Sequence, residues 1–235
     1  DVVSIMAPNT HVMYEAHFGI PMAGAIINTI NIRLDAKTIS YILSHSKTKL
    51  LLVDTEFLPT IRQALKIGKL KINIIAIKDE KQFSHNIQKE QLYENFLLKG
   101  KKNFSYMMRI KDEWSPISLS YTSGTTSKPK GVVTHHRGAY LNAINNQIVW
   151  NMKKNPIYLW TLPMFHCNGW CFPWTIVALA GTQICTNKFD GKEILKLIDK
   201  YSVTHLCGAP IVLQMIIDNK KRKKTKHIVN IMTAA

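Results

Sequence analysis

The sequence has no apolar run long enough to cross a membrane. A membrane-spanning helix needs roughly 20 consecutive apolar residues, and the most apolar stretch, Ile157–Cys185, is interrupted several times. The interrupting residues are Pro163, His166, Asn168, Pro173 and Gly181. We therefore expect no transmembrane segment and interpret this stretch as buried core beside a cleft. We also expect no signal peptide, because Asp1-Val-Val-Ser is not a basic region followed by an apolar core.

Cysteine is scarce, with four residues: Cys167, Cys171, Cys185 and Cys207. Three residues separate Cys167 from Cys171, and His166 is adjacent, so a metal site has to be considered. Structural zinc sites usually show two paired clusters of ligands, and no second pair is present. We therefore expect no metal site, and favour buried, reduced thiols in an intracellular protein.

Acidic residues are few: 15 Asp and Glu stand against 31 Lys and Arg, which gives a net charge of +16. Much of the excess lies in two lysine-rich stretches, Lys99–Lys102 and Lys220–Lys224. Such stretches can bind nucleic acid or an anionic surface, or act as nuclear-import signals. No aromatic residues interleave with them to stack on bases. We therefore expect solvated loops and no nucleic-acid partner.

The order of apolar segments predicts an α/β fold. Among the 235 residues, 46% are hydrophobic and 20% charged, as in an ordinary globular protein. Short runs of Ile, Leu and Val alternate with helical patterns, which is typical of strands buried on both faces of a sheet. The predicted strands are Leu50–Val53, Ile72–Ile77, Ile117–Tyr121, Ile157–Thr161, Thr182–Cys185, Val203–Leu206 and Ile228–Met232.

Helices are predicted between these strands. Asp35 is expected to cap a helix that runs through Ser44, and Asp190 with Glu193 has capping-box spacing ahead of another. A third helix starts near Pro210 and runs through Met215. A fourth follows Gly138, with an apolar stripe formed by Tyr140, Leu141, Ile144 and Ile148. The polar, weakly periodic segment 79–115 is interpreted as a surface excursion and a candidate subdomain junction.

A loop rich in hydroxyl groups follows the predicted strand Ile117–Tyr121. Its residues are Thr122, Ser123, Gly124, Thr125, Thr126 and Ser127, followed by Lys128, Pro129, Lys130 and Gly131. Gly124 allows the backbone to approach a ligand closely, and successive N–H groups in such a turn can bind an anion. The hydroxyls and the two lysines add donors and positive charge, so the segment predicts a triphosphate cradle. The spacing does not match a Walker A loop. The alternative is a plain polar surface loop.

The segment Thr122–Gly131 strongly resembles the signature loop of the adenylate-forming (AMP-binding) superfamily, which includes acyl-CoA synthetases, luciferases and peptide-synthetase adenylation domains. In that family the loop holds the β- and γ-phosphates of Mg-ATP, which implies this role for Thr122 to Ser127, Lys128 and Lys130. Two positions differ from the family pattern. Ser127 stands where Gly is common, and His135-His136-Arg137 where Ser-His-Arg is usual.

Other segments extend the resemblance over essentially the whole chain. Leu162–Trp170 resembles the second family motif and implies that His166 is a catalytic-site residue lining the acyl and adenylate cleft. Trp170, Phe172 and Trp174 are expected either to shape the acyl pocket or to pack in the core. The resemblance also includes four further segments: Met6–Asn9, Ala23–Ala25, Asn31–Asp35 and Cys207–Pro210. The residues of these motifs are most similar to those of plant acyl-activating enzymes.

The resemblance implies an acid–thiol ligase that uses ATP, Mg²⁺ and CoA. A small carboxylic acid, short- or medium-chain or aromatic, attacks the α-phosphate to give acyl-AMP and pyrophosphate, and the CoA thiolate then displaces AMP. Residues 1–235 correspond to an incomplete large N-terminal domain with mixed and parallel sheets flanked by helices. We expect a fragment without the C-terminal domain, inactive alone, from a cytoplasmic or peroxisomal protein. The alternatives are a peptide-synthetase-type adenylation domain and a non-catalytic basic remnant.

Overall fold

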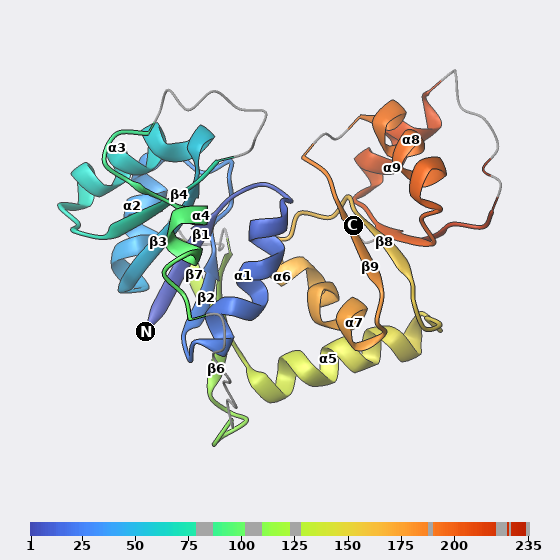
Figure 1. Ribbon diagram of the computed structural model, residues 1–235, viewed down its shortest axis with the longest axis horizontal. Helices are drawn as coiled ribbons and strands as arrows, with labels where there is room; N and C mark the ends of the chain where they lie inside the picture. Colours follow the sequence, from blue (N-terminus) through green and yellow to red (C-terminus); the bar gives the residue numbers. More distant parts are fainter. Residues whose placement is uncertain are drawn as a thin grey trace. The chain divides into compact units, whose positions relative to one another are not determined.

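The computed structural model describes residues 1–78, 87–101, 110–122, 128–187, 190–219, 225 and 227–233. The chain forms two compact units (Figure 1). Unit 1 contains Asp1–Pro8 and Val12–Ala139, and unit 2 contains Asn9–His11 and Tyr140–Ala235.

Unit 1 is built on a seven-stranded sheet with the order β5-β4-β3-β1-β2-β6-β7. The strands are β1 (Val2–Met6), β2 (Ile26–Thr29), β3 (Thr48–Asp54), β4 (Asn73–Ile77), β5 (Gln91–Leu92), β6 (Pro116–Thr122) and β7 (Lys130–His135). Neighbouring strands are parallel, except that β7 runs antiparallel to β6. The carboxyl ends of the parallel strands therefore lie at one edge of the sheet.

Helices of unit 1 bury an apolar core against this sheet. They are α1 (His11–Met22), α2 (Ala36–His45), α3 (Leu58–Gly68) and α4 (Tyr93–Leu97), with a short 3₁₀ helix at Thr55–Phe57. Residues of α2 and α3 pack with β1, β3 and β4 in one cluster that includes Ile39, Leu43, Leu51, Val53 and Ile61. The predicted cap of α2 is confirmed, because Asp35 Oδ1 accepts from the N–H groups of Lys37 at 2.8 Å and Thr38 at 3.0 Å.

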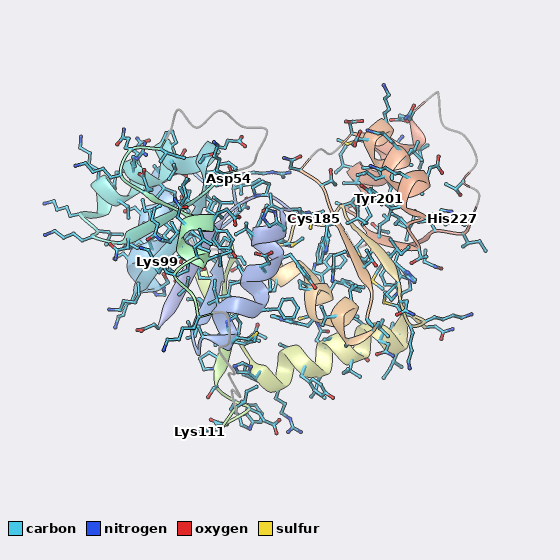
Figure 2. All side chains as sticks on the ribbon, viewed as in Figure 1. Asp54, Lys99, Lys111, Cys185, Tyr201 and His227 are labelled. Carbon is cyan, nitrogen blue, oxygen red and sulfur yellow. The ribbon has the colours of Figure 1, made fainter. Side chains whose placement is uncertain are left out.

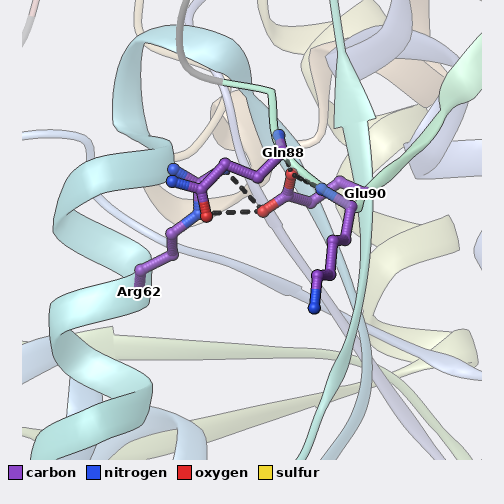
Figure 3. A network of polar contacts seen from close by, with 4 residues as sticks. Arg62, Gln88 and Glu90 are labelled. Atoms are coloured by element: carbon purple, nitrogen blue, oxygen red, sulfur yellow. Dashed lines mark hydrogen bonds and ion pairs between the residues drawn. The ribbon is translucent and has the colours of Figure 1, made fainter.

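The segment before β5 is tied to α3 by an ion pair (Figure 3). Arg62 of α3 donates from Nη2 to Glu90 Oε1 at 2.7 Å, and Glu90 Oε2 accepts from the N–H groups of Gln88 and Lys89. The described part of the predicted excursion 79–115 thus carries β5 and α4 of unit 1. Positions 79–86 and 102–109 lie outside the described residues. The two units divide at Ala139 and Tyr140, and the candidate junction at 79–115 lies within unit 1.

Unit 2 contains a four-stranded parallel sheet with the order β11-β10-β8-β9. Its strands are β8 (Ile157–Trp160), β9 (Thr182–Cys185), β10 (His205–Cys207) and β11 (Asn230–Met232). The helices are α5 (His136–Val149), which begins in unit 1, α6 (Cys167–Trp170), α7 (Phe172–Ala178), α8 (Gly191–Tyr201) and α9 (Pro210–Ile217). Leu159, Ile194, Ile198, Val203 and Leu206 form a core between the sheet and α8.

All seven predicted strands are present, with ends that differ by at most two residues. The caps and helices predicted at Asp35, Asp190 and Pro210 are confirmed; Asp190 Oδ1 accepts from the N–H of Glu193 at 2.8 Å. The predicted helix after Gly138 is α5, and most residues of its predicted apolar stripe are exposed. Tyr140, Leu141 and Ile148 are 66%, 53% and 70% exposed.

The buried side of α5 is formed instead by Ala139 and Ala143. Within unit 2, the small side chain of Ala143 allows the backbone of α5 to approach α7, where the Thr175 hydroxyl donates to the carbonyl of Ala143 at 3.0 Å. Close backbone packing thus replaces burial of the larger side chains. Within the described part of the chain, no helix is long and apolar enough to cross a membrane.

Candidate functional site

The predicted phosphate loop connects β6 to β7 in unit 1. It follows the carboxyl end of β6, the edge of a parallel sheet at which ligands usually bind. Thr122 and Lys130 are paired across the two strands, and Thr122, Lys128 and Lys130 are all exposed. Ser123, Gly124, Thr125, Thr126 and Ser127 lie outside the described residues. The described ends of the loop thus present two ammonium groups and a hydroxyl to solvent.

Both ends of the loop contact α2. Before the loop, the hydroxyl of Tyr121 lies 2.8 Å from His45 Nδ1. After it, Lys128 Nζ lies 5.7 Å from the centre of the Tyr41 ring, within the range of a cation–π interaction. Gly131 lies opposite Tyr121 on β7, and a β-carbon there would lie 3.1 Å from Leu119 Cδ1 and in ordinary contact with the Tyr121 ring at 3.4 Å.

His135 supports the start of α5. Its Nδ1 accepts from the N–H of Gly138 at 2.9 Å, which is the hydrogen bond of a helix N-cap. An imidazole therefore caps the helix at the position where the resemblance to the family leads one to expect serine. Its ring also packs on Trp114, with centroids 4.6 Å apart, and Arg137 pairs with Glu113 at 3.0 Å. These contacts indicate structural roles for His135, the last residue of β7, and for Arg137 in the first turn of α5.

In unit 2, the segment that follows His166 forms a left-handed turn. Five consecutive residues have positive φ: Cys167 at 48°, Asn168 at 51°, Gly169 at 55°, Trp170 at 56° and Cys171 at 67°. Two hydrogen bonds close the turn, from the N–H of Gly169 to the carbonyl of His166 at 2.9 Å and from Cys171 to Asn168 at 3.1 Å. A left-handed conformation costs roughly 1–2 kcal/mol for each residue with a β-carbon. The surrounding structure must therefore hold this turn.

Buried groups hold the turn on both sides. Gly169 lies directly on the Trp160 ring, which is buried and donates from Nε1 to Gln183 Oε1 at 2.6 Å. Asn146 of α5 donates to the carbonyl of Trp170 at 2.8 Å. The Thr175 hydroxyl also lies 3.2 Å from the carbonyl of Cys171. The backbone carrying His166 is thus fixed by residues from β8, α5 and α7.

Asn9 holds the chain that leads to His166. The buried side chain donates from Nδ2 to the carbonyls of Trp160 at 3.0 Å and Leu162 at 2.9 Å, and its Oδ1 accepts from the N–H of Met164 at 2.8 Å. The sequence placed Asn9 in a matching segment but gave it no role. The only signal was a polar residue directly after an apolar run and Pro8.

His166 itself is exposed at the start of the turn, and its N–H donates to the carbonyl of Pro163 at 3.1 Å. Its Nε2 lies 4.0 Å from the exposed Cys167 thiol, whereas Cys171 is buried. Burial raises the pKa of both thiols, so both keep their proton at neutral pH. Among the described residues, no three His, Cys, Asp or Glu side chains form a group suited to a metal ion.

The aromatic residues near the turn have different environments. Phe172 is completely buried and stacks on Tyr158, with centroids 5.2 Å apart and planes 20° apart. It is therefore a core residue and does not line an open pocket. Trp170 and Trp174 are half-buried, so for these two residues an acyl-pocket role stays a prediction.

The lysine-rich stretches are only partly described. Lys99 of the first stretch, two residues after α4, is exposed, as is Lys111 outside the stretches and ahead of β6 (Figure 2). Lys102 and the stretch Lys220–Lys224 lie outside the described residues. The expected absence of a nucleic-acid partner stays a prediction.

The family described as "AMP-binding enzyme" matches residues 1–234. The chain belongs to this family. It is 45% identical to a peroxisomal acetate/butyrate–CoA ligase of Arabidopsis thaliana over 99% of this chain and 43% of that protein. It is 47% identical to a peroxisomal benzoate–CoA ligase of the same plant over 92% of this chain and 39% of that protein. The chain thus spans less than half the length of these relatives.

Solved structures support the same fold. The inhibitor-bound N-terminal domain of FACL13 from Mycobacterium tuberculosis is 21% identical, with a TM-score of 0.81 over 99% of this chain and 56% of that chain. The o-succinylbenzoate coenzyme A synthetase of Bacillus subtilis, in complex with ATP and magnesium ion, gives a TM-score of 0.74 at 22% identity over 99% of this chain and 44% of that chain. The expected α/β fold, like the N-terminal domain of adenylate-forming enzymes, is confirmed.

Proposed function

We propose that the chain supplies the phosphate-binding and part of the acyl-binding residues of an acid–thiol ligase. The ligase activates a small carboxylic acid with ATP and transfers the acyl group to CoA. The observation that carries this proposal is the pair of exposed lysines and the hydroxyl of Thr122 at the carboxyl end of β6, in a chain of the AMP-binding enzyme family. The named relatives are ligases of acetate, butyrate and benzoate, which supports short-chain or aromatic acids and favours CoA over a carrier protein.

The reaction has two steps. A carboxylate oxygen attacks the α-phosphorus of ATP, the bond to the bridging oxygen breaks, and pyrophosphate leaves. The thiolate of CoA then attacks the acyl carbon and expels AMP. Lys128 and Lys130 would neutralise negative charge that develops on the departing pyrophosphate, and the loop hydroxyls and N–H groups would bind its oxygens. We place His166 beside the carboxylate or acyl phosphate, where a fixed backbone would orient the imidazole.

The described residues fit ATP better than they fit a protein-bound magnesium ion. Two ammonium groups and a hydroxyl suit phosphate oxygens, whereas no cluster of carboxylates suited to a metal occurs in the described part of the chain. The names of both plant ligases cited above include "peroxisomal", which supports the peroxisome over the cytoplasm as the site of action.

Binding of MgATP and of pyrophosphate to the 235-residue chain tests the role of the loop. Replacing Lys130 by Ala removes one charge-assisted contact, and we expect affinity to fall about tenfold or more in isothermal titration calorimetry. Lys196→Ala is the matched control, because Lys196 lies on α8 and pairs with Glu193 at 3.3 Å. Absence of binding by the unaltered chain, or equal binding by the Lys130 variant, would contradict the proposal.

Activity requires a separate test. We expect no carboxylate-dependent ATP–pyrophosphate exchange from the 235-residue chain, because it spans less than half the length of its relatives. Exchange with acetate, butyrate or benzoate by this chain alone would show that the remaining length is dispensable.

A further inference from the structure

Two aromatic side chains of α2 lie one helical turn apart beside the phosphate loop. Tyr41 and His45 are at positions i and i+4, which places them on the same face of a helix. Their rings stack with centroids 5.4 Å apart and planes 24° apart. His45 also meets the Tyr121 ring edge-on, at 5.8 Å and 80°. The three rings therefore form one continuous cluster, which we call the α2 aromatic clamp: Tyr41, His45 and Tyr121.

The α2 aromatic clamp contacts the chain on both sides of the loop. Tyr121 is the residue before Thr122, and its hydroxyl lies 2.8 Å from His45 Nδ1. Lys128 is the first described residue after the loop, and its ammonium lies 5.7 Å from the Tyr41 ring centre. We propose that Tyr41 and His45 are positioning residues that hold the two ends of the phosphate loop at a fixed separation for the triphosphate. This inference rests on the proposed function.

The electrostatic environment agrees with this arrangement. Burial, followed by the neighbouring Tyr41, raises the pKa of Tyr121 to about 12. The phenol therefore keeps its proton at neutral pH and can act as donor or acceptor towards His45. The Tyr41 ring presents its electron-rich face to the Lys128 ammonium, so that the charge has a preferred location before a phosphate is present. No residue of the α2 aromatic clamp has to touch the nucleotide for this effect.

A series of side-chain hydrogen bonds connects the C-terminal end of α2, which carries Tyr41 and His45, to the sheet. Ser46, directly after α2, is hydrogen-bonded to Thr48 of β3 at 2.7 Å, and Thr48 to Ser4 of β1 at 2.7 Å. Asn28 of β2 donates to Ser4 Oγ at 2.8 Å. These side chains are buried, and they fix the end of α2 against three strands. Tyr41 and His45 are thus presented from a rigid support.

The test compares variants of the 235-residue chain by ligand binding and by hydrogen exchange. His45→Ala and Tyr41→Leu are each expected to weaken binding of MgATP and of pyrophosphate about two- to fivefold, since one hydrogen bond or one exposed cation–π contact is lost. Both variants are also expected to raise amide exchange in peptides covering 117–135. His45→Asn is the rescue variant, because an Asn amide can occupy the place of Nδ1 and should restore both values.

Tyr201→Leu is the matched control, because Tyr201 in unit 2 also packs under a lysine, with Lys200 Nζ 4.8 Å from its ring centre. It should change neither measurement. If the unaltered chain binds MgATP and the Tyr41 and His45 variants bind it equally, with unchanged exchange, the inference is overturned while the proposed function stands. If the unaltered chain binds neither ligand, the proposed function fails and the inference fails with it. If His45→Ala weakens ligand binding and His45→Asn does not restore it, the positioning role of His45 is also overturned.

Discussion

The substitution Gly169→Ala probes the left-handed turn directly. Gly169 has φ of +55°, and a β-carbon there would lie 2.6 Å from Cζ3 and 2.8 Å from Cη2 of Trp160. Carbon atoms in contact normally approach to about 3.5–4.0 Å. The Trp160 ring has little freedom to move away, because it is completely buried, bonded to Gln183 and packed edge-on against Tyr158 at 4.9 Å. The added methyl group must therefore displace either the ring or the turn.

Two costs add in this variant. A residue with a β-carbon in the left-handed region costs roughly 1–2 kcal/mol. Overpacking a well-filled core by one methyl group costs roughly 1–3 kcal/mol. We therefore expect the free energy of unfolding of unit 2 to fall by about 2–5 kcal/mol. His166 should be displaced as well, because its carbonyl accepts the first hydrogen bond of the turn.

Urea unfolding followed by tryptophan fluorescence measures this loss. Four of the five tryptophans, Trp150, Trp160, Trp170 and Trp174, lie in unit 2, so the signal reports mainly on that unit. Gly19→Ala is the control in unit 1, followed by the fluorescence of Trp114 in a variant that lacks the other four tryptophans, because Gly19 lies within α1 and a β-carbon there meets no atom within 4 Å. It should be neutral or stabilising by up to about 1 kcal/mol. A loss below about 1 kcal/mol in Gly169→Ala would refute the reasoning, since the ring or turn would then adjust freely.

Two further predictions concern single polar side chains. Asn9→Ala removes three hydrogen bonds to the buried segment 160–164, and urea unfolding should show a loss of about 2–4 kcal/mol; an unchanged midpoint would mean that water replaces the amide. For Glu90, burial alone raises the pKa, but the N–H of Gln88 and the Arg62 guanidinium lower it below its usual value overall. A carboxyl group whose pKa is lower in the folded than in the unfolded state stabilises the fold at pH values above its ordinary pKa. This stabilisation is lost as the pH falls through the lowered pKa of the folded state. Glu90→Gln should therefore be less stable than the unaltered chain at neutral pH, with a difference that shrinks in acid; a constant difference would contradict the ion pair.

Two of the strands that the sequence missed, β1 and β2, each carry a buried polar side chain. Strands β1 and β2 were not predicted, although β1 lies between β2 and β3 in the sheet. Ser4 interrupts the apolar run of β1, and Asn28 interrupts β2. Both side chains are buried and bonded to each other at 2.8 Å. From sequence alone, a polar residue in a strand is expected to be exposed unless its hydrogen-bond partner is known. Here Ser4 and Asn28 are partners that lie 24 residues apart in the sequence.

The two parts of the candidate site differ in how far the sequence could predict them. The loop was predicted from its own residues, because consecutive hydroxyls, a glycine and two lysines are sufficient to suggest a phosphate ligand. The family motif marked His166, but no local pattern indicated the left-handed turn after it. Four of the five residues in that turn carry β-carbons, and such residues favour right-handed backbone. The contacts that hold the turn come from distant positions such as Asn146 and Trp160.

These contacts imply that the two parts of the site are held to different degrees. Four left-handed residues with β-carbons represent roughly 4–8 kcal/mol of local strain, which only a rigid surrounding can sustain. The backbone at His166 is therefore set before any ligand binds, and ordering it adds no entropic cost to binding. The ends of the phosphate loop depend on partly exposed contacts to His45 and Tyr41, each contributing about 1 kcal/mol or less. Substitutions near His166 should therefore act mainly on the stability of unit 2, whereas substitutions in the α2 aromatic clamp should act mainly on phosphate affinity.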